Sequence, residues 1–193
     1  MTCSRASTRT RIIDFKSCCR IAGGQADDGR DHAGGDGAGG HRHQWHGSRS
    51  KVRLADEIAA QRPNLLASIL VLPRMGVDLE ELEVPLHILL VTFQAMKRSG
   101  HVWPIVSEDV QDRCMQRLTA RARFNEGLPG DLAKQMVQQF CDEHPERYLL
   151  AFVYGYLGKH DLLRARTDPE KYLLMAALNL AECIADVGAK TSA

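Results

Sequence analysis

The chain has 193 residues, with 25 Lys or Arg against 24 Asp or Glu, and its formal net charge is +1. A charge so close to zero provides no strong field for nucleic acid or for an anionic membrane. The longest apolar run, residues 148–157, is too short to cross a bilayer, and no apolar segment of the signal-peptide type follows the N-terminus. The length fits one domain, or one domain and a tail.

Residues 1–50 differ in composition from the rest of the chain. They hold nine of the 16 glycines and four of the eight histidines, and between residues 17 and 50 the only large apolar residues are Ile21 and Trp45. So little apolar surface cannot offset the entropy lost when a backbone is ordered, so we predict a disordered tail. Because the composition changes abruptly at residue 51, a further hypothesis is that translation starts at Val52 and that the natural product lacks this tail. Detection of an intact N-terminal peptide by mass spectrometry would contradict that hypothesis.

Three patterns in this tail lack the context that would make them functional. The run 35–40 matches G-x-G-x-x-G, but a dinucleotide site needs a strand before this pattern and a helix after it. His41, His43 and His46 would bind a transition metal only weakly, since no fold fixes their geometry. Residues 1–25 have the Arg and Ser content of a transit peptide but poor helical amphipathicity. We therefore expect neither a cofactor nor a metal ion.

From Lys51 onward, apolar residues recur at the spacing of one helix after another. The expected helices cover 54–62, 63–72, 86–97, 107–122, 132–143, 145–157 and 168–188. Segment 101–106 has strand character, but it contains Pro104 and has no partner strand, so we predict an extended loop. Its Trp103 would pack on the core or roof a pocket. The sequence thus predicts a single all-α domain over residues 51–190, with six or seven helices in a bundle-like core.

The last expected helix is the most apolar part of the chain. Asp168 is predicted to cap its N-terminus, Pro169 suits its first turn, and Gly188 is predicted to end it. A helix that is apolar nearly all round belongs inside a bundle or at a subunit interface. We therefore expect the three most apolar segments, 86–97, 148–157 and 169–187, to meet at the centre of the fold.

Three polar residues interrupt this helix on one narrow face, and we call them the polar stripe: Asn179, Glu182 and Asp186. In one interpretation they line a pocket and supply ligands or a general base. In the other they are the thin solvent-exposed edge of a buried helix, which is the more common fate of acidic residues. We favour the solvent edge.

A second polar feature is the arginine ridge, formed by Arg113, Arg117 and Arg121 at intervals of four residues. Such a ridge suits phosphate or nucleic-acid contact. It is equally typical of a solvated helix face, with Asp109 pairing with Arg113. Because no aromatic residues are interleaved and the helical part of the chain is slightly acidic, we favour the solvated face.

Other residues of interest have structural explanations. His87 is expected at a rim, and the Glu143–His144 pair at a helix junction suits either acid–base chemistry or helix capping. Three cysteines lie singly among apolar residues and show no metal-ligand spacing: Cys114, Cys141 and Cys183. This is the pattern of reduced core thiols, so we expect a cytoplasmic protein.

The sequence contains no P-loop, nucleophile elbow, zinc-protease motif or EF-hand loop. Our leading expectation is a non-enzymatic protein-binding or adaptor module, with a protein partner or a second copy of itself. One alternative is an enzyme or small-ligand-binding protein that uses the polar stripe with His87, His144 or Trp103. The other is a nucleic-acid accessory protein that uses the arginine ridge.

Overall fold

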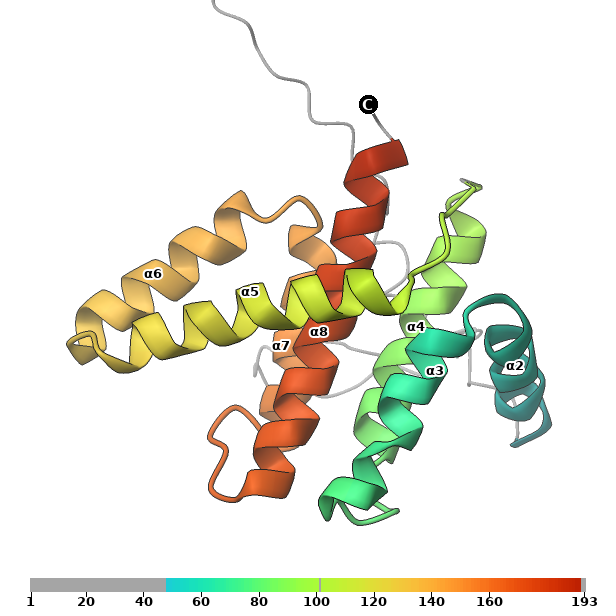
Figure 1. The fold of residues 1–193 in the computed structure, drawn as a ribbon, viewed down its shortest axis with the longest axis horizontal. Coiled ribbons are helices and arrows are strands. Elements are labelled where there is room, and N and C mark those ends of the chain that lie inside the picture. The colour runs from blue at the N-terminus through green and yellow to red at the C-terminus, as the bar shows by residue number, and fades with distance from the viewer. Residues whose placement is uncertain (1–47, 101, 192–193) are drawn as a thin grey trace, which may run out of the picture.

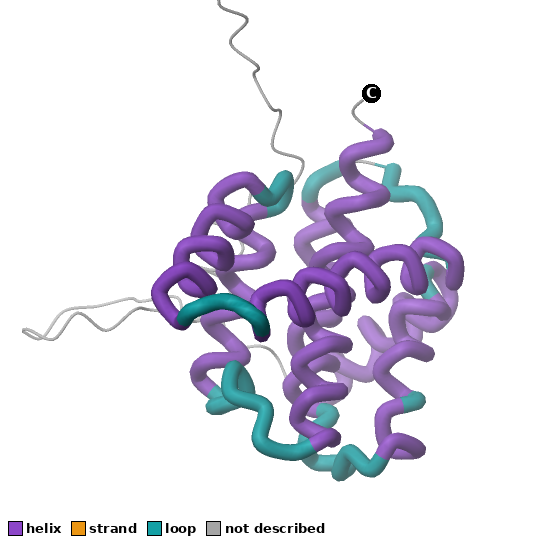
Figure 2. The backbone as a smooth tube through the Cα atoms, turned by 60° about the vertical axis from the view of Figure 1, so that its left-hand side comes forward, coloured by secondary structure: helices purple, strands orange, loops and turns teal. Residues whose placement is uncertain are grey.

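The computed structural model describes residues 48–100 and 102–191, so the predicted tail lies almost entirely outside the described residues (Figure 1). In the described part, seven α-helices and one short 3-10 helix follow each other without a strand (Figure 2). They are α2 (Ser48–Gln61), α3 (Pro63–Leu70), η1 (Leu72–Met75), α4 (Glu83–Arg98), α5 (Glu108–Glu126), α6 (Gly130–Glu143), α7 (Arg147–Lys159) and α8 (Asp168–Thr191). This confirms the predicted all-α, bundle-like fold.

Helix α8 is the centre of the bundle. It contacts α3, η1, α4, α5 and α7, and its side chains between Leu173 and Val187 are mostly buried. In Figure 1, α8 runs through the middle of the molecule, α3 and α4 lie on one side, α6 and α7 lie on the other, and α5 crosses over it. Because α4, α7 and α8 also contact one another pairwise, the prediction that the three most apolar segments meet is confirmed.

The predicted helix ends are correct in part. Ser107 caps α5, because its Oγ accepts a hydrogen bond from the Val110 amide at 3.4 Å. The cap of α8 is Thr167, whose Oγ1 accepts from the Glu170 amide at 3.3 Å. Asp168 was predicted to be this cap. It is instead the first residue of α8, and the Glu170 amide donates to Thr167. Gly188 was also predicted wrongly as the helix end, because α8 continues to residue 191.

The loop between α4 and α5 is extended and buries its tryptophan, as predicted. Gly100 adopts the left-handed conformation with a φ of 71°, which turns the chain away from α4. Trp103 is buried, and its Nε1 donates a hydrogen bond to Ser99 Oγ at 3.0 Å. Arg62 Nη2 donates to the Trp103 carbonyl and ties this loop to the start of α3. Trp103 lines neither of the cavities described below, so the alternative of a pocket roof has no support from them.

Candidate functional site

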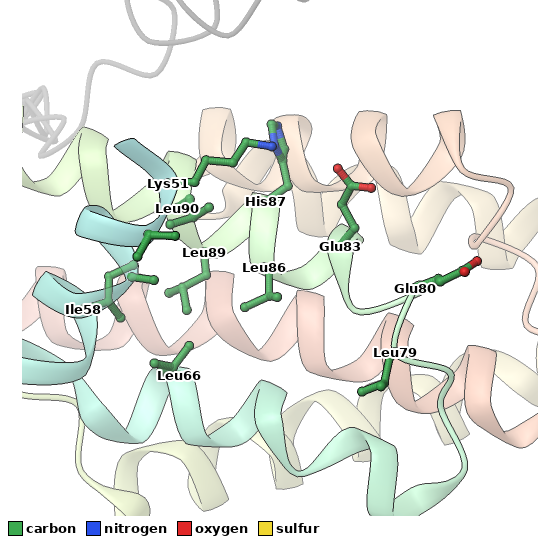
Figure 3. A pocket seen from close by; sticks show the side chains of 12 residues that line it. Lys51, Ile58, Leu66, Leu79, Glu80, Glu83, Leu86, His87, Leu89 and Leu90 are labelled. Carbon is green, nitrogen blue, oxygen red and sulfur yellow. The ribbon is translucent and has the colours of Figure 1, made fainter. Parts of the chain in front are cut away.

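An open apolar groove lies between α2, α3 and α4 (Figure 3). Its volume is about 590 Å³. Its apolar lining consists of Val52, Ala55, Ile58, Leu66, Leu79, Leu86, Leu89 and Leu90, and its polar lining consists of Lys51, Glu80, Glu83 and His87. A concave, mainly apolar surface with a few polar groups at its edge is the common form of a binding site.

Helix α2 packs on α3 and α4 and leaves part of its apolar surface open to the groove. Leu54 and Ile58 are its buried apolar residues, whereas Val52 is 59% exposed. On the opposite side, the turn between η1 and α4 carries Leu79, which is 77% exposed. Apolar side chains left uncovered around a hollow mark an interaction surface more often than isolated exposed ones do.

His87 lies at the edge of this groove. Its ring stacks on Tyr156 of α7, with 4.5 Å between the ring centroids and 16° between the planes. Burial lowers the pKa of His87, and the nearby positive charge of Lys51 lowers it further, while Glu83 acts in the opposite direction. The ring is therefore neutral at pH 7.

A smaller cavity of about 250 Å³ adjoins the groove on the side of the turn before α4. It shares Glu80 and Glu83 with the groove and adds Glu81, His160 and three apolar side chains from α4, α8 and the turn after α7. The carboxylates of this part of the chain thus gather at one end of the groove.

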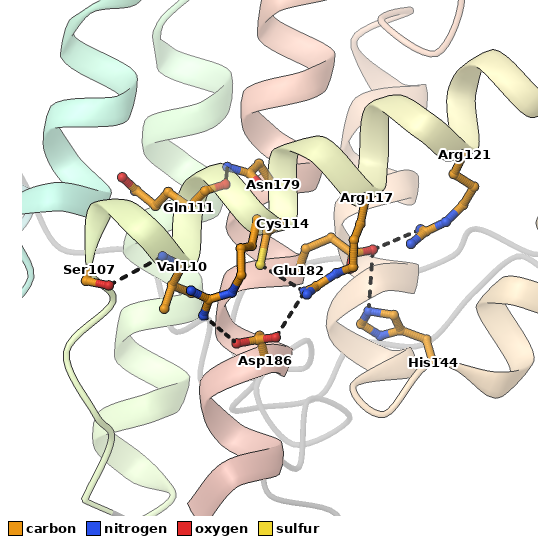
Figure 4. A network of polar contacts seen from close by, with 11 residues as sticks. Ser107, Val110, Gln111, Cys114, Arg117, Arg121, His144, Asn179, Glu182 and Asp186 are labelled. Atoms are coloured by element: carbon orange, nitrogen blue, oxygen red, sulfur yellow. Dashed lines mark hydrogen bonds and ion pairs between the residues drawn. The ribbon is translucent and has the colours of Figure 1, made fainter.

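The polar stripe and the arginine ridge face each other across the α5–α8 interface (Figure 4). Arg117 Nη2 lies 3.0 Å from Asp186 Oδ1, and Arg121 Nη1 lies 2.9 Å from Glu182 Oε1. Arg113 Nη2 lies 3.9 Å from the other Asp186 oxygen. The two features form one network of ion pairs, in which three guanidinium groups are matched by two carboxylates.

The structure therefore corrects the interpretation of the polar stripe as a solvent edge. Glu182 is 7% exposed and Asn179 is equally buried, because α5 covers both. Asn179 Nδ2 donates to the Gln111 carbonyl at 3.4 Å. The arginine ridge has the expected exposure at Arg113 and Arg117, whose side chains are 50% and 46% exposed, but its ion pairs run to α8 and not to Asp109. Neither feature lines the groove or the smaller cavity.

His144 joins this network from the junction of α6 and α7. Its side chain is 3% exposed, and its Nδ1 accepts a hydrogen bond from the Glu146 amide at 3.2 Å. A neutral ring that accepts at Nδ1 carries its proton on Nε2, which lies 3.9 Å from Glu182 Oε1, too far for a hydrogen bond. Burial lowers the pKa of His144, although the Glu182 carboxylate opposes this effect. Glu143, its neighbour in sequence, accepts from Gln139 Nε2 on the surface at 2.9 Å.

Sequence reasoning missed Glu146, the acid with the most unusual environment. It is 4% exposed, and burial raises its pKa to about 7. Within the two described segments, its carboxyl group has no ion-pair or hydrogen-bonding partner. The sequence carries no signal for this, because a glutamate just after a proline and at the start of a helix is normally solvated.

Two cysteines meet inside the α5–α8 interface, and we predict that they resist modification. Cys114 and Cys183 are fully buried, and burial raises the pKa of both thiols. Because the thiolate is the reactive form, both should react with iodoacetamide more than about 100-fold more slowly in the folded protein than in urea. Peptide-resolved mass spectrometry measures both rates, with half-buried Cys141 as the internal comparison. Equal rates for Cys183 and Cys141 would contradict the prediction.

The described residues contain no group of three or more His, Cys, Asp or Glu side chains arranged to hold a metal ion. None of the helices in the described ranges combines the length and the apolar character needed to cross a bilayer. Comparison with protein-family models, with curated proteins and with solved structures finds no match. The function is therefore argued from the groove and its surroundings.

Proposed function

We propose that this protein is a non-enzymatic protein-binding module that holds the apolar face of a partner helix in the groove between α2, α3 and α4. The supporting observation is the set of eight apolar residues that line the groove, among which Val52 and Leu79 are 59% and 77% exposed. Three helices already form its walls and floor, so a fourth helix would complete the local packing at the usual interaxial distance of about 8–10 Å.

The length of α2 sets the length that we expect for a helical occupant. Helix α2, which forms one wall, has 14 residues, and a partner helix of similar length would span ~20 Å. Such a helix would present apolar anchors at positions i, i+3, i+4 and i+7. Burying three or four leucines, less the entropy of association, corresponds to a dissociation constant of about 10–100 μM.

The alternative functions have less support from the geometry. An enzyme that used the polar stripe would need those groups to converge in a cavity, but they bind residues of α5. A nucleic-acid protein that used the arginine ridge would need unpaired positive charge, but Glu182 and Asp186 neutralise much of that charge. Among the described residues that line the groove, His87 is the one titratable ring, and burial together with Lys51 lowers its pKa.

Self-association and a cytoplasmic location remain parts of the proposal. The hairpin of α5 and α6 exposes Phe124 and Leu132 close to its tip, where a second copy would bury further apolar surface. The unpaired buried thiols Cys114 and Cys183 suit a reducing compartment.

The proposal predicts that a designed amphipathic peptide binds in this groove. The probe is a fluorescent peptide of about 14 residues with leucines on one helical face, at i, i+3, i+4 and i+7. Leu79→Lys and Leu86→Lys should each weaken its binding about tenfold, because each places a charge where the leucine face must dock. Fluorescence anisotropy measures the affinity.

The matched control is Leu163→Lys, which changes an exposed leucine that does not line the groove. It should leave the affinity unchanged. No binding by the parent protein, or equal losses in all three variants, would contradict the proposed function.

A further inference from the structure

The charges at the edge of the groove are distributed unevenly along its length. In Figure 3, Lys51, His87, Glu83 and Glu80 follow one another from the α2 side towards the turn before α4. The groups whose charge lowers the pKa of His87 are Lys51, His160 and Lys159. The acidic end is extended by Glu81, which lines the adjoining cavity together with Glu80 and Glu83.

The acidic end lacks a cation of its own. Glu80 and Glu83 are exposed, and within residues 48–100 and 102–191 neither has an ion-pair partner within 4.0 Å. Glu81 accepts a hydrogen bond from the Asp78 amide at 3.2 Å but likewise has no ion pair in this part of the chain. Of the described residues, His160 is the one basic side chain that lines the adjoining cavity. The groove therefore joins an apolar floor to an end with two unmatched carboxylates.

These charges distinguish the two directions in which a helix could lie. The N-terminus of a helix carries a partial positive charge and its C-terminus a partial negative charge. A helix with its first turn at Glu80 and Glu83 and its last turn beside Lys51 has both ends complemented. The reverse direction places like charges together at both ends.

We infer that the groove selects one class of partner in one direction: an amphipathic helix with Lys or Arg in its first turn, which lies against Glu80 and Glu83, and with its last turn beside Lys51. This inference rests on the proposed function, since it assumes that the groove binds a helix. Two or three exposed ion pairs and the helix dipole correspond to a gain of about five- to tenfold in affinity over a neutral peptide.

The first experiment compares three capped peptides with the same leucine face: one with three lysines in the first turn, one with three lysines in the last turn, and one with glutamines at all these positions. The N-basic peptide should bind about five- to tenfold more tightly than the neutral peptide at low salt, and this advantage should shrink above ~0.5 M salt. The double variant Glu80→Lys/Glu83→Lys should abolish the advantage. The matched control Glu108→Lys/Glu126→Lys, on α5, should retain it.

The second experiment determines the direction of binding. A nitroxide label on the first turn of the N-basic peptide should broaden the amide NMR signals of residues 79–83, and a label on its last turn should broaden those of residues 51–55. The opposite pattern, or equal affinity of all three peptides, would overturn the inference while leaving the proposed function in place. Absence of binding by every peptide would overturn the proposed function itself. Binding of palmitate that excludes the peptides would assign the groove to an acyl-chain ligand and would overturn both.

Discussion

Replacing Glu146 with glutamine should raise the free energy of unfolding by about 2–3 kcal/mol at pH 8 and change it little at pH 4.5. The reason is burial, which raises the pKa of this carboxyl group from its ordinary value of 4.5 to about 7. Between these two pH values, the folded protein holds a proton that the unfolded chain has released. The folded state therefore loses stability as the pH rises through this window, and glutamine, which carries no charge, avoids that loss.

Urea unfolding at pH 4.5, 6 and 8 measures the effect, with Glu126→Gln as a control at an exposed position on α5. The control should leave the pH dependence as it is in the parent protein. If the midpoints of the parent and of Glu146→Gln run parallel over this range, then the Glu146 carboxyl is not protonated in the folded state.

His144 should produce the opposite trend on the acidic side. Burial lowers its pKa below the ordinary value of 6.5, so the unfolded chain takes up a proton at a higher pH than the folded protein does. The stability associated with a neutral His144 is complete above pH 6.5 and is lost as the pH falls through the lower, folded-state pKa. His144 lowers the stability of the folded protein at acidic pH, and Glu146 lowers it at alkaline pH. The helix junction is therefore most stable between these two limits.

The architecture of the described chain was predictable because burial imposes a helical period on the sequence. Apolar residues at this spacing identified α4, α7 and α8 as the most apolar helices, and the structure places these three in mutual contact. Helix ends were less predictable, since Thr167 and Asp168 are both good caps and the choice between them depends on where the first turn closes.

The sequence contains a pattern that predicts the pairing of the polar stripe with the arginine ridge. The pattern becomes visible only when the two helices are compared with each other. The ridge repeats at every fourth residue, and Glu182 and Asp186 are also four residues apart. Two helices with matching periods and opposite charges can neutralise each other along their whole contact. Each pattern considered by itself is typical of a solvated face, and this is why the pairing of the two was not predicted.

The groove was not predictable, because no single segment defines it. Ile58, Leu66 and Leu90 are at ordinary core positions of their own helices. Whether such residues are covered depends on how far α2 stands from α3 and α4, which is set by the packing of the whole bundle. The sequence can indicate an excess of apolar helix surface, but it cannot indicate where that excess stays uncovered.

Replacing Arg121 with methionine should lower the free energy of unfolding by about 2–3 kcal/mol at pH 8, because it leaves a buried carboxylate without its partner. Within the described part of the chain, Glu182 Oε1 would retain only neutral His144, at 3.9 Å. The reciprocal change, Glu182→Gln, should cost about 1 kcal/mol, because Arg121 is 29% exposed and can turn to water. Arg123→Met, an exposed neighbour on α5, is the matched control and should change stability by less than about 0.5 kcal/mol.

A double-mutant cycle of Arg121→Met and Glu182→Gln isolates the interaction, and NMR titration of His144 supplies an independent measurement. The charge of Arg121 lowers the pKa of His144, whereas that of Glu182 raises it. Arg121→Met should therefore raise the pKa of His144, and Glu182→Gln should lower it. Because a mere packing defect would move both values in the same direction, shifts of opposite sign would identify the three side chains as one electrostatic unit. Additive stabilities in the double variant, with no shift of the His144 titration, would instead show that the Arg121–Glu182 ion pair contributes nothing to the packing of α5 on α8.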